Sequence, residues 1–256
     1  MIRIIATINA WVVGLLSTAW HGAWILGCAA IGGRCRARAC HAAPRSWSRT
    51  MLRAAGVRVE LEGLENLDPP RPAVLVSNHQ SWYDVFALAG HLPVDYRFVG
   101  KAELARIPVF GPAWLACGNI AIDRSNRAGA IRSLSVAGQR LVEDRAVVVM
   151  FPEGTRSTDG CLLPFKKGAF MLALQLGVPI IPVAVAGTRA IMPKGAWSVR
   201  PGTVRVRFGE PIEVDGFDQS QRDLLIEQVR RRIFELREPR LAGDPPPALD
   251  ERSLST

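Results

Sequence analysis

The first constraint on this chain is a long uncharged segment near its N-terminus. From Ile4 to Gly33, thirty consecutive residues include no Asp, Glu, Lys or Arg. As a helix this segment would be about 45 Å long, whereas the hydrocarbon core of a bilayer is about 30 Å thick. A buried soluble helix fits poorly, because no polar stripe marks a second face. The segment therefore predicts a membrane-embedded helix. It either spans the bilayer with a tilt or breaks near Gly22 or Gly27 and re-enters the same leaflet.

A run of arginines follows this segment, and no acidic residue appears before Glu60. The cytoplasmic flanks of membrane helices carry such an excess of Lys and Arg. We therefore expect the rest of the chain on the cytoplasmic face of a membrane, which is the inner membrane if the source is bacterial. The arginines of this run are Arg34, Arg36, Arg38, Arg45, Arg49 and Arg53.

Residues 44–56 have an amphipathic pattern. At helical spacing, one face carries Trp47, Met51 and Ala55, and the opposite face carries the last three of these arginines. That pattern is typical of a helix lying in a membrane interface. The alternative is an ordinary surface helix that packs on the core. After a membrane segment we favour the interfacial interpretation, so residues 1–56 are predicted to form a membrane anchor with a basic interfacial helix.

The remainder alternates between strand-like and helix-like segments. This alternation predicts one α/β catalytic domain over residues 57–238, with a mixed sheet flanked by helices. Residues 239–256 offer no apolar face and are predicted to be a disordered tail. The expected strands are residues 57–61, 73–77, 96–99, 119–122, 146–151, 178–185 and 204–208. The expected helices are residues 82–90, 127–143, 168–176 and 219–236.

Composition narrows the class of partner. A hydrophobic content of 48% excludes disorder of the whole chain. The net charge of +9 suits partners that carry phosphate, either nucleic acid or anionic lipid. No nucleic-acid-binding motif is present, so we expect no nucleic-acid partner. The five cysteines form no C-x-x-C pair, which indicates neither a disulfide framework nor a zinc site and favours a reducing cytoplasm.

The first candidate for chemistry follows the strand-like segment 73–77. His79 and Asp84 lie five positions apart, which on an ideal helix is a rotation of about 140°. A turn must therefore bend His79 back before its ring can meet Asp84. If it does, Asp84 accepts from one ring nitrogen and leaves the other as a base. A helix N-terminus would help to keep that base neutral. A histidine that merely hydrogen-bonds within a loop is the alternative, and the spacing alone leaves both open.

A second polar loop follows the apolar segment 146–151. Arg156 offers a planar fork suited to phosphate, and Gly154 lets backbone N–H groups approach an anion closely. Glu153 could bind a hydroxyl or orient Arg156. A solvated Arg–Glu pair in a polar turn is the alternative. Two such loops in one chain favour a site at one end of the sheet.

Other cations occupy similar positions near predicted strand ends. Together they could form an anion site, although Asp123 could instead neutralise Arg124. No G-x-S-x-G elbow is present, so a nucleophilic enzyme is not expected. Nor do the residues suggest a metal site. These further cations are Lys101, Arg124, Lys166 and Lys167.

Several blocks in order along residues 57–215 resemble the 1-acyl-sn-glycerol-3-phosphate acyltransferase family. The first is Asn78-His79 with Asp84, and the second, some seventy residues later, is the segment from Phe151 to Ser157. Four blocks in the right order are more specific than any block alone. The third block comprises residues 100–104, 107–111 and 118–124, and the fourth is residues 178–185.

The resemblance implies roles for individual residues. His79 would be the general base and Asp84 its orienting partner. The remaining implied residues surround the acceptor and its glycerol phosphate. These substrate-binding residues are Glu153, Gly154, Thr155, Arg156, Lys101 and Arg124.

The resemblance also implies a reaction. A thioester donor, acyl-CoA or acyl carrier protein, would acylate the 2-hydroxyl of lysophosphatidate to give phosphatidate, with no metal or other cofactor. Another lysolipid, such as a lyso-ornithine lipid, could be the acceptor. Two other classes remain open: a non-enzymatic basic protein of the membrane surface, and a hydrolase in which His79 and Asp84 activate water.

Overall fold

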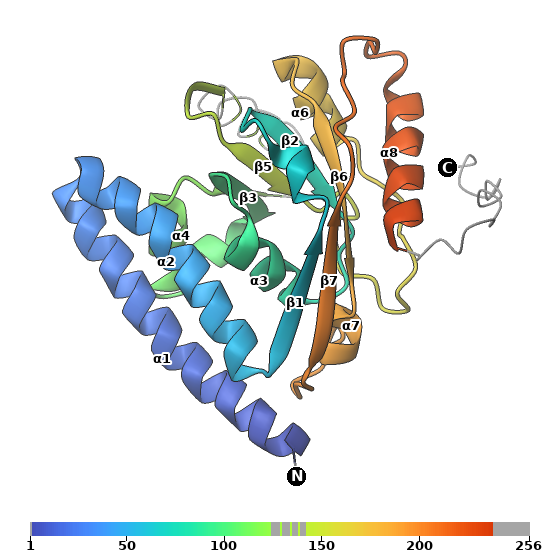
Figure 1. The fold of residues 1–256 in the computed structure, drawn as a ribbon. Helices are drawn as coiled ribbons and strands as arrows, with labels where there is room; N and C mark the ends of the chain where they lie inside the picture. The colour runs from blue at the N-terminus through green and yellow to red at the C-terminus, as the bar shows by residue number, and fades with distance from the viewer. Residues whose placement is uncertain (1, 124–128, 130–133, 135–137, 139–141, 238–256) are drawn as a thin grey trace.

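The computed structural model describes residues 2–123 and 142–237, together with residues 129, 134 and 138. A seven-stranded sheet has helices on both faces, as Figure 1 shows. The predicted α/β class with a mixed sheet is confirmed. The predicted helix 127–143 and the predicted tail 239–256 lie largely or wholly outside the described residues. The strands are β1 Val57–Glu62, β2 Ala73–Ser77, β3 Tyr96–Lys101, β4 Ile120–Ile122, β5 Val147–Met150, β6 Ile180–Ala186 and β7 Gly202–Phe208. The helices are α1 Ile2–Ile31, α2 Gly33–Ala54, α3 Trp82–His91, α4 Phe110–Ala116, α6 Gly168–Leu176, α7 Thr188–Ile191 and α8 Arg222–Arg237.

The strand order is β1-β7-β6-β2-β5-β3-β4, which places β2 at the centre. β2 runs parallel to both β5 and β6, and β3 runs parallel to β5. The pair β6–β7 is antiparallel, which makes the sheet mixed. Because the carboxyl ends of β2, β5 and β3 lie at one edge, the loops that leave these strands are neighbours there.

Side chains alternate across the central strands and fill two cores. Leu75 of β2 packs with Phe86 of α3 on one face of the sheet. Val74 and Val76 point to the other face, where they pack with Phe170 of α6 and with residues of α8. This alternation follows from the pleat, in which successive side chains leave opposite faces. A sheet covered on both faces explains why β2 and β5 read as continuous apolar runs.

α1 is one unbroken helix, so of the two alternatives the one with a break near Gly22 or Gly27 is wrong. Gly22 instead allows close packing, because a Cβ there would lie 2.5 Å from Val109 next to α4. The chain reverses at Gly32 and Gly33, whose φ values of 76° and 50° are in the left-handed region. α2 then returns alongside α1 (Figure 1).

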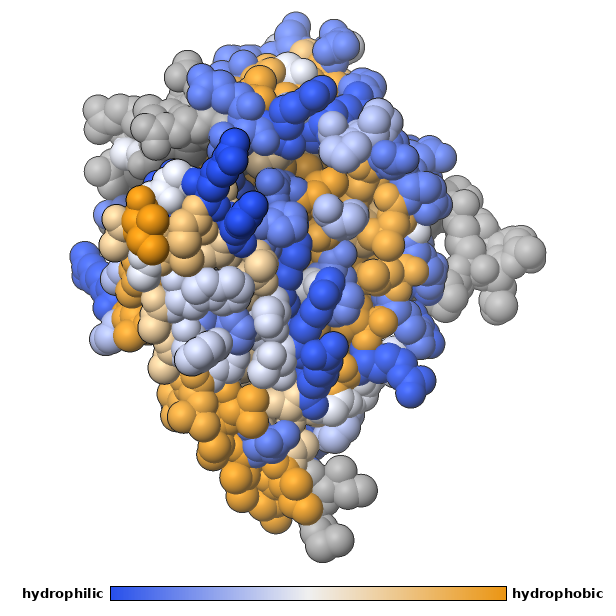
Figure 2. Space-filling model, turned by 60° about the vertical axis from the view of Figure 1, so that its left-hand side comes forward, coloured by the Kyte–Doolittle hydropathy of each residue, from blue (hydrophilic) through white to orange (hydrophobic). Residues whose placement is uncertain are grey.

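The outer side of α1 is apolar and exposed. Residues Arg3–Ile31 are long and apolar enough to cross a membrane, by length and composition. Only 22% of the most apolar part of this helix is buried inside the protein. Figure 2 shows hydrophobic side chains gathered over the lower end of the molecule, where Figure 1 places the N-terminal part of α1. The exposed large apolar residues of α1 are Ile4, Ile5, Ile8, Trp11, Val12, Leu15, Leu16, Trp20, Trp24 and Ile31.

α2 keeps only part of the arginine stripe expected for residues 44–56, because Arg49 and Arg53 are exposed whereas Arg45 is not. Arg45 is buried and donates to the carbonyl oxygens of Leu92 and Val94, just beyond the end of α3. Arg49 donates to the carbonyl oxygen of Gly90 at 2.6 Å. Cations suit a helix C-terminus, where backbone carbonyls lack partners within the helix. α2 therefore lies between α1 and α3, and the interfacial role predicted for residues 44–56 stays a prediction.

Cys40 of α2 and Cys117 next to α4 form a disulfide, although the spacing of the cysteines predicted none. They are 77 positions apart in the chain. The packing of α2 near α4 brings the two cysteines together. Spacing rules detect only cysteines that are close in the chain, so no local signal marks this pair. The bond ties the N-terminal helices to the rest of the protein.

Candidate active site

The loop that leaves β2, residues 77–84, is anchored to β6 by a buried asparagine. We call this segment the β2 loop. The side-chain amide of Asn78 donates to the carbonyl oxygen of Val185 at 2.9 Å, and its side-chain oxygen accepts from the Val185 N–H at 2.8 Å. Asn78 therefore pairs with a strand as a backbone group would. This pairing fixes the point from which the next residue, His79, leaves the sheet.

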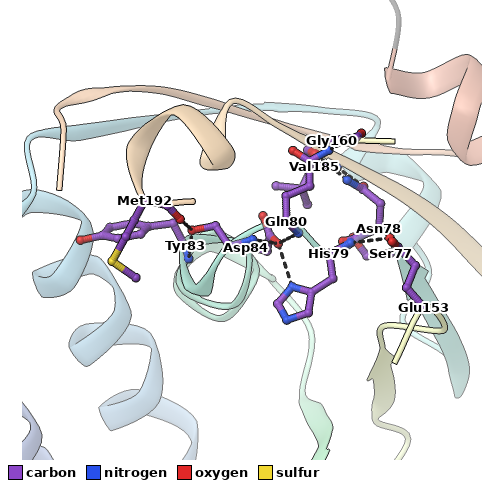
Figure 3. A network of polar contacts seen from close by, with 11 residues as sticks. Ser77, Asn78, His79, Gln80, Tyr83, Asp84, Glu153, Gly160, Val185 and Met192 are labelled. Carbon is purple, nitrogen blue, oxygen red and sulfur yellow. Dashed lines mark hydrogen bonds and ion pairs between the residues drawn. The ribbon is translucent and has the colours of Figure 1, made fainter. Parts of the chain in front are cut away.

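The side chains of His79 and Asp84 form a hydrogen bond, which their spacing in the chain had left open. Nδ1 of His79 lies 2.8 Å from Oδ2 of Asp84, and Figure 3 shows the ring turned toward the carboxylate. The same oxygen accepts from the backbone N–H groups of Gln80 and Ser81. Ser81 is the N-cap of α3 and Asp84 completes its capping box. The turn required to bring the histidine back is therefore the start of a capped helix.

The geometry determines which ring nitrogen of His79 is available. An ionised carboxylate can only accept, so Nδ1 carries the hydrogen and Nε2 keeps a lone pair. Among the described residues, none hydrogen-bonds to Nε2. The ring stacks on Phe151 at a centroid distance of 4.1 Å, and 16% of the side chain is exposed. His79 is therefore held in one orientation with one nitrogen free to act as a base.

The loop that leaves β5, residues 151–166, holds the second buried carboxylate. We call this segment the β5 loop. The two oxygens of Glu153 accept from the backbone N–H groups of His79, at 2.8 Å, and Leu163, at 3.1 Å. Burial raises the pKa of Glu153 to about 7, although the two N–H donors act in the opposite direction. Within the described residues, no hydrogen bond joins Glu153 to Arg156. Glu153 therefore holds backbone groups rather than Arg156, and its predicted place in the acceptor site stays a prediction.

Arg156 lies over a tryptophan from the β2 loop. Its guanidinium carbon is 5.2 Å from the ring centroid of Trp82, a cation–π geometry. Burial lowers the pKa of Arg156, while the nearby Asp84 carboxylate opposes that change. Arginine stays charged in proteins, so the guanidinium remains a cation beside the His79–Asp84 pair. Among the described residues it forms no salt bridge, so its donors are available to an anion.

Gly154 and Thr155 lie between these two groups. Gly154 has φ 69°, and a Cβ there would lie 2.8 Å from the side chain of Lys166, so the turn requires glycine. The Thr155 hydroxyl accepts from Nζ of Lys194 at 3.0 Å. The cation Lys166 therefore packs directly on the turn that presents Arg156.

Of the two other predicted phosphate-binding residues, the structure describes only one. Lys101 ends β3 with an exposed side chain, at the same sheet edge as the β2 and β5 loops. Arg124 lies outside the described residues. Lys101 and Arg156 are therefore the cations of this predicted set that the structure places near the β2 and β5 loops.

Three cations near the site were missed in the sequence. Arg189 donates to the Thr158 carbonyl at 2.9 Å, and Arg237 donates to the Gly160 carbonyl. Lys194 contacts Thr155. These cations come from α7, the segment after it and the end of α8, so no local motif marks them. Within the described part of the chain, no three His, Cys, Asp or Glu side chains gather as a metal site.

The site has the features of a group-transfer enzyme: an oriented base and a nearby cation at strand ends of an α/β sheet. Comparison with known proteins gives the family. Residues 58–186 match the family model described as acyltransferase. The chain belongs to the acyltransferase family.

Named relatives and a solved structure agree with this assignment. The chain is 37% identical over 174 residues to a 1-acyl-sn-glycerol-3-phosphate acyltransferase of Limnanthes alba, covering 68% of this chain and 61% of that protein. It is 38% identical over 163 residues to the Pseudomonas aeruginosa protein of the same name, covering 63% of this chain and 62% of the relative. It also resembles the crystal structure of the 1-acyl-sn-glycerophosphate acyltransferase PlsC from Thermotoga maritima. The TM-score is 0.77 with 28% identity, covering 93% of this chain and 98% of that one.

The match covers only part of the curated relatives. The chain spans about 61% and 62% of the length of the two relatives described above.

Proposed function

We propose that this protein transfers a fatty acyl group from a thioester to the 2-hydroxyl of 1-acyl-sn-glycerol 3-phosphate and forms phosphatidate. The observation that carries the proposal is the His79–Asp84 pair, with Nδ1 bonded to the carboxylate at 2.8 Å and Nε2 unbonded among the described residues. A base with a guanidinium beside it suits a hydroxyl acceptor that also carries a phosphate. The names of the relatives support this choice of acceptor.

The acceptor phosphate would bind to Arg156 and Lys101. In lysophosphatidate the 2-hydroxyl and the phosphate are on adjacent carbons, so the phosphate must bind close to the base. Arg156 meets this requirement, because its guanidinium lies within electrostatic reach of Asp84. Its guanidinium lies over the Trp82 ring, and the planar fork of this group can form two parallel hydrogen bonds to phosphate oxygens.

The chemical step follows from the tautomer of His79. Nε2 takes the proton of the 2-hydroxyl while that oxygen forms a bond to the thioester carbonyl carbon. The imidazolium that results is stabilised by Asp84. As the tetrahedral intermediate collapses, the C–S bond breaks and the sulfur leaves with the electron pair. The imidazolium then returns the proton to the thiolate, so the base is regenerated and no net charge is created.

Acyl-CoA or acyl carrier protein would supply the thioester, and we propose no metal or other cofactor. The side chains of the site define the reaction more closely than they define the headgroup of the acceptor lipid. A second lysolipid, such as a lyso-ornithine lipid, would use the same base. The cation pair Arg156 and Lys101 favours lysophosphatidate, whose phosphate carries more negative charge.

We also propose that α1 lies along one leaflet of a membrane, with the catalytic domain on the cytoplasmic face. The support is that α1 contacts the protein along its length. Asn9 donates to the carbonyl oxygen of Ala54 near one end, and Gly22 approaches Val109 farther along. A helix held in this way keeps one apolar face exposed, which suits embedding in one leaflet more than spanning. Lysophosphatidate would then reach the site directly from the bilayer.

The test is thiol release by the full-length protein with acyl-CoA or acyl carrier protein, with and without lysophosphatidate, and with lipid products identified by mass. We expect thiol release that depends on the acceptor and yields phosphatidate. Free fatty acid without acceptor would identify a hydrolase. Turnover only with another lysolipid would overturn the acceptor assignment. Failure with both donors and every lysolipid would overturn the enzyme assignment.

A further inference from the structure

One large apolar side chain of the catalytic domain is exposed far from α1 in sequence. Trp197 lies between α7 and β7, and 76% of it is exposed. A single exposed apolar residue is normal on a protein surface. Trp197, however, lies beside Trp11 of α1, with ring centroids 5.5 Å apart. Nε1 of Trp11 donates to the backbone carbonyl of Trp197 at 2.9 Å. The two indoles therefore form one exposed surface.

The segment around Trp197 is bonded to one stripe of α1. We call residues 193–199 the Trp197 loop. Arg3 donates to the Ser198 hydroxyl, and the Val199 N–H donates to the Thr7 hydroxyl at 3.0 Å. With Trp11, these α1 residues are spaced four apart, so they form one face of the helix. The exposed apolar residues of α1 lie on the adjacent face, and the Trp197 loop extends that surface sideways.

Charge on both elements suits an anionic partner. No acidic residue occurs before Glu60, and none occurs between Gly187 and Gly209. The exposed cation Arg200 directly follows the loop. Basic residues at a membrane surface contribute about 1 kcal/mol each toward anionic lipids. Tryptophan is enriched at membrane interfaces, where its ring is buried while its N–H remains near water.

We propose that the Trp197 loop is a second membrane-contact element, which inserts Trp197 into the interface of a bilayer that contains anionic lipids. This inference rests on the proposed membrane docking of α1 and extends it to the catalytic domain. Because the loop is bonded to α1 at several points, both elements enter the same leaflet. Two contacts from distant parts of the chain fix the rotation of the domain about the axis of α1, which a single helix would leave free.

The test uses tryptophan fluorescence of the full-length protein in vesicles of phosphatidylcholine and phosphatidylglycerol whose acyl chains carry bromine, a quencher. The chain has seven tryptophans, and Trp197→Phe removes one. If Trp197 is inserted, the variant loses a quenched fluorophore and the quenched fraction falls. If Trp197 is in water, the variant loses an unquenched fluorophore and the quenched fraction rises. The second result would overturn the proposal.

Two controls separate this proposal from the docking of α1. Trp20→Phe changes an exposed tryptophan of α1, and its quenched fraction should also fall. If it does not, the docking of α1 is wrong, and the present inference fails with it. For vesicle affinity, Trp197→Ala should weaken binding by about tenfold, which corresponds to losing much of one buried aromatic side chain. The matched variant Leu224→Ala, which truncates an exposed side chain on α8, should leave affinity unchanged. Equal losses in both variants would also overturn the proposal, and neither readout requires turnover.

Discussion

The β2 loop and the β5 loop meet at one edge of the sheet, and each contains a buried carboxylate beside His79. Asp84 is 0% exposed, and its Oδ2 accepts hydrogen bonds from the His79 ring and from two backbone N–H groups. Glu153 is 3% exposed, and each of its oxygens receives one backbone N–H. The two carboxylates are thus almost equally buried, but their hydrogen-bond partners differ.

Burial alone therefore does not identify a catalytic carboxylate. Asp84 contacts His79, the proposed base, and fixes the hydrogen of its ring on Nδ1. Glu153 touches only backbone, so it holds the β2 loop against the β5 loop. Arg156 adds a third part, because it belongs to the β5 loop but lies over Trp82 of the β2 loop. We infer that the β2 loop carries the proton chemistry and the β5 loop carries binding and support.

The largest expected effect is loss of the base. His79→Ala should lower kcat by about 10²–10⁴-fold, the usual contribution of a positioned general base. The free energy of unfolding should change little, because Asp84 keeps its two backbone donors. Acceptor-dependent thiol release by the detergent-solubilised protein measures kcat. Denaturant unfolding in the same detergent measures the free energy of unfolding. Phe151→Leu is the control, since it removes the stacked ring but keeps the base. A folded His79→Ala protein with near-normal kcat would refute the mechanism.

The second prediction tests whether Glu153 has a supporting role. Burial raises its pKa from 4.5 to about 7, which corresponds to about 3 kcal/mol. The folded protein therefore keeps a proton that the unfolded chain has already released. This stabilising contribution is fully present below pH 4.5 and is lost as pH rises through about 7.

Glu153→Gln cannot titrate, so its free energy of unfolding should lack this fall between pH 4.5 and 7. Denaturant unfolding of both proteins across that range measures the difference. Parallel curves would show that the carboxylate does not titrate there. Kinetics give a separate check. If the substitution raised the acceptor KM and left kcat unchanged, Glu153 would belong to the acceptor site, as the sequence resemblance implied.

The third prediction concerns binding by the β5 loop. Arg156→Ala should raise the acceptor KM by about 10- to 100-fold, the value of a charge-assisted hydrogen bond to phosphate. The donor KM should not change. Arg156→Lys keeps the charge but loses the planar fork, so it should recover only part of the affinity. A change confined to the donor KM would mean that Arg156 binds the donor instead.

The smallest expected effect concerns the contact between the two loops. Trp82→Leu removes the ring beneath Arg156 and keeps an apolar side chain. A partly exposed cation–π pair contributes about 0.5–1 kcal/mol, so the acceptor KM should rise by about two- to fivefold. In the Arg156→Ala background, the same substitution should have almost no further effect. Additive effects in this double-mutant cycle would show that Trp82 does not act through Arg156.

Contacts between residues close in the chain were predictable from the sequence. His79 and Asp84 are five positions apart, and the start of one helix is enough to bring them together. The strand 73–77 and the helix 168–176 were predicted with their observed ends, because each is a continuous apolar run with clear flanks. The uncharged N-terminal segment likewise predicted a long apolar helix. In each case the determining interactions lie within a few turns of the chain.

Contacts between distant segments were decided only by the tertiary structure. Glu153 reaches the backbone N–H of His79 across 74 positions, and Cys40 bonds Cys117 across 77. Arg45 had the spacing of an outward-facing stripe, but the end of α3 lies beside it and the carbonyl oxygens there accept hydrogen bonds from its buried guanidinium. Sequence periodicity reports which residues share a face. Which neighbour covers that face depends on the order of strands in the sheet, and this order is set by packing the whole chain at once.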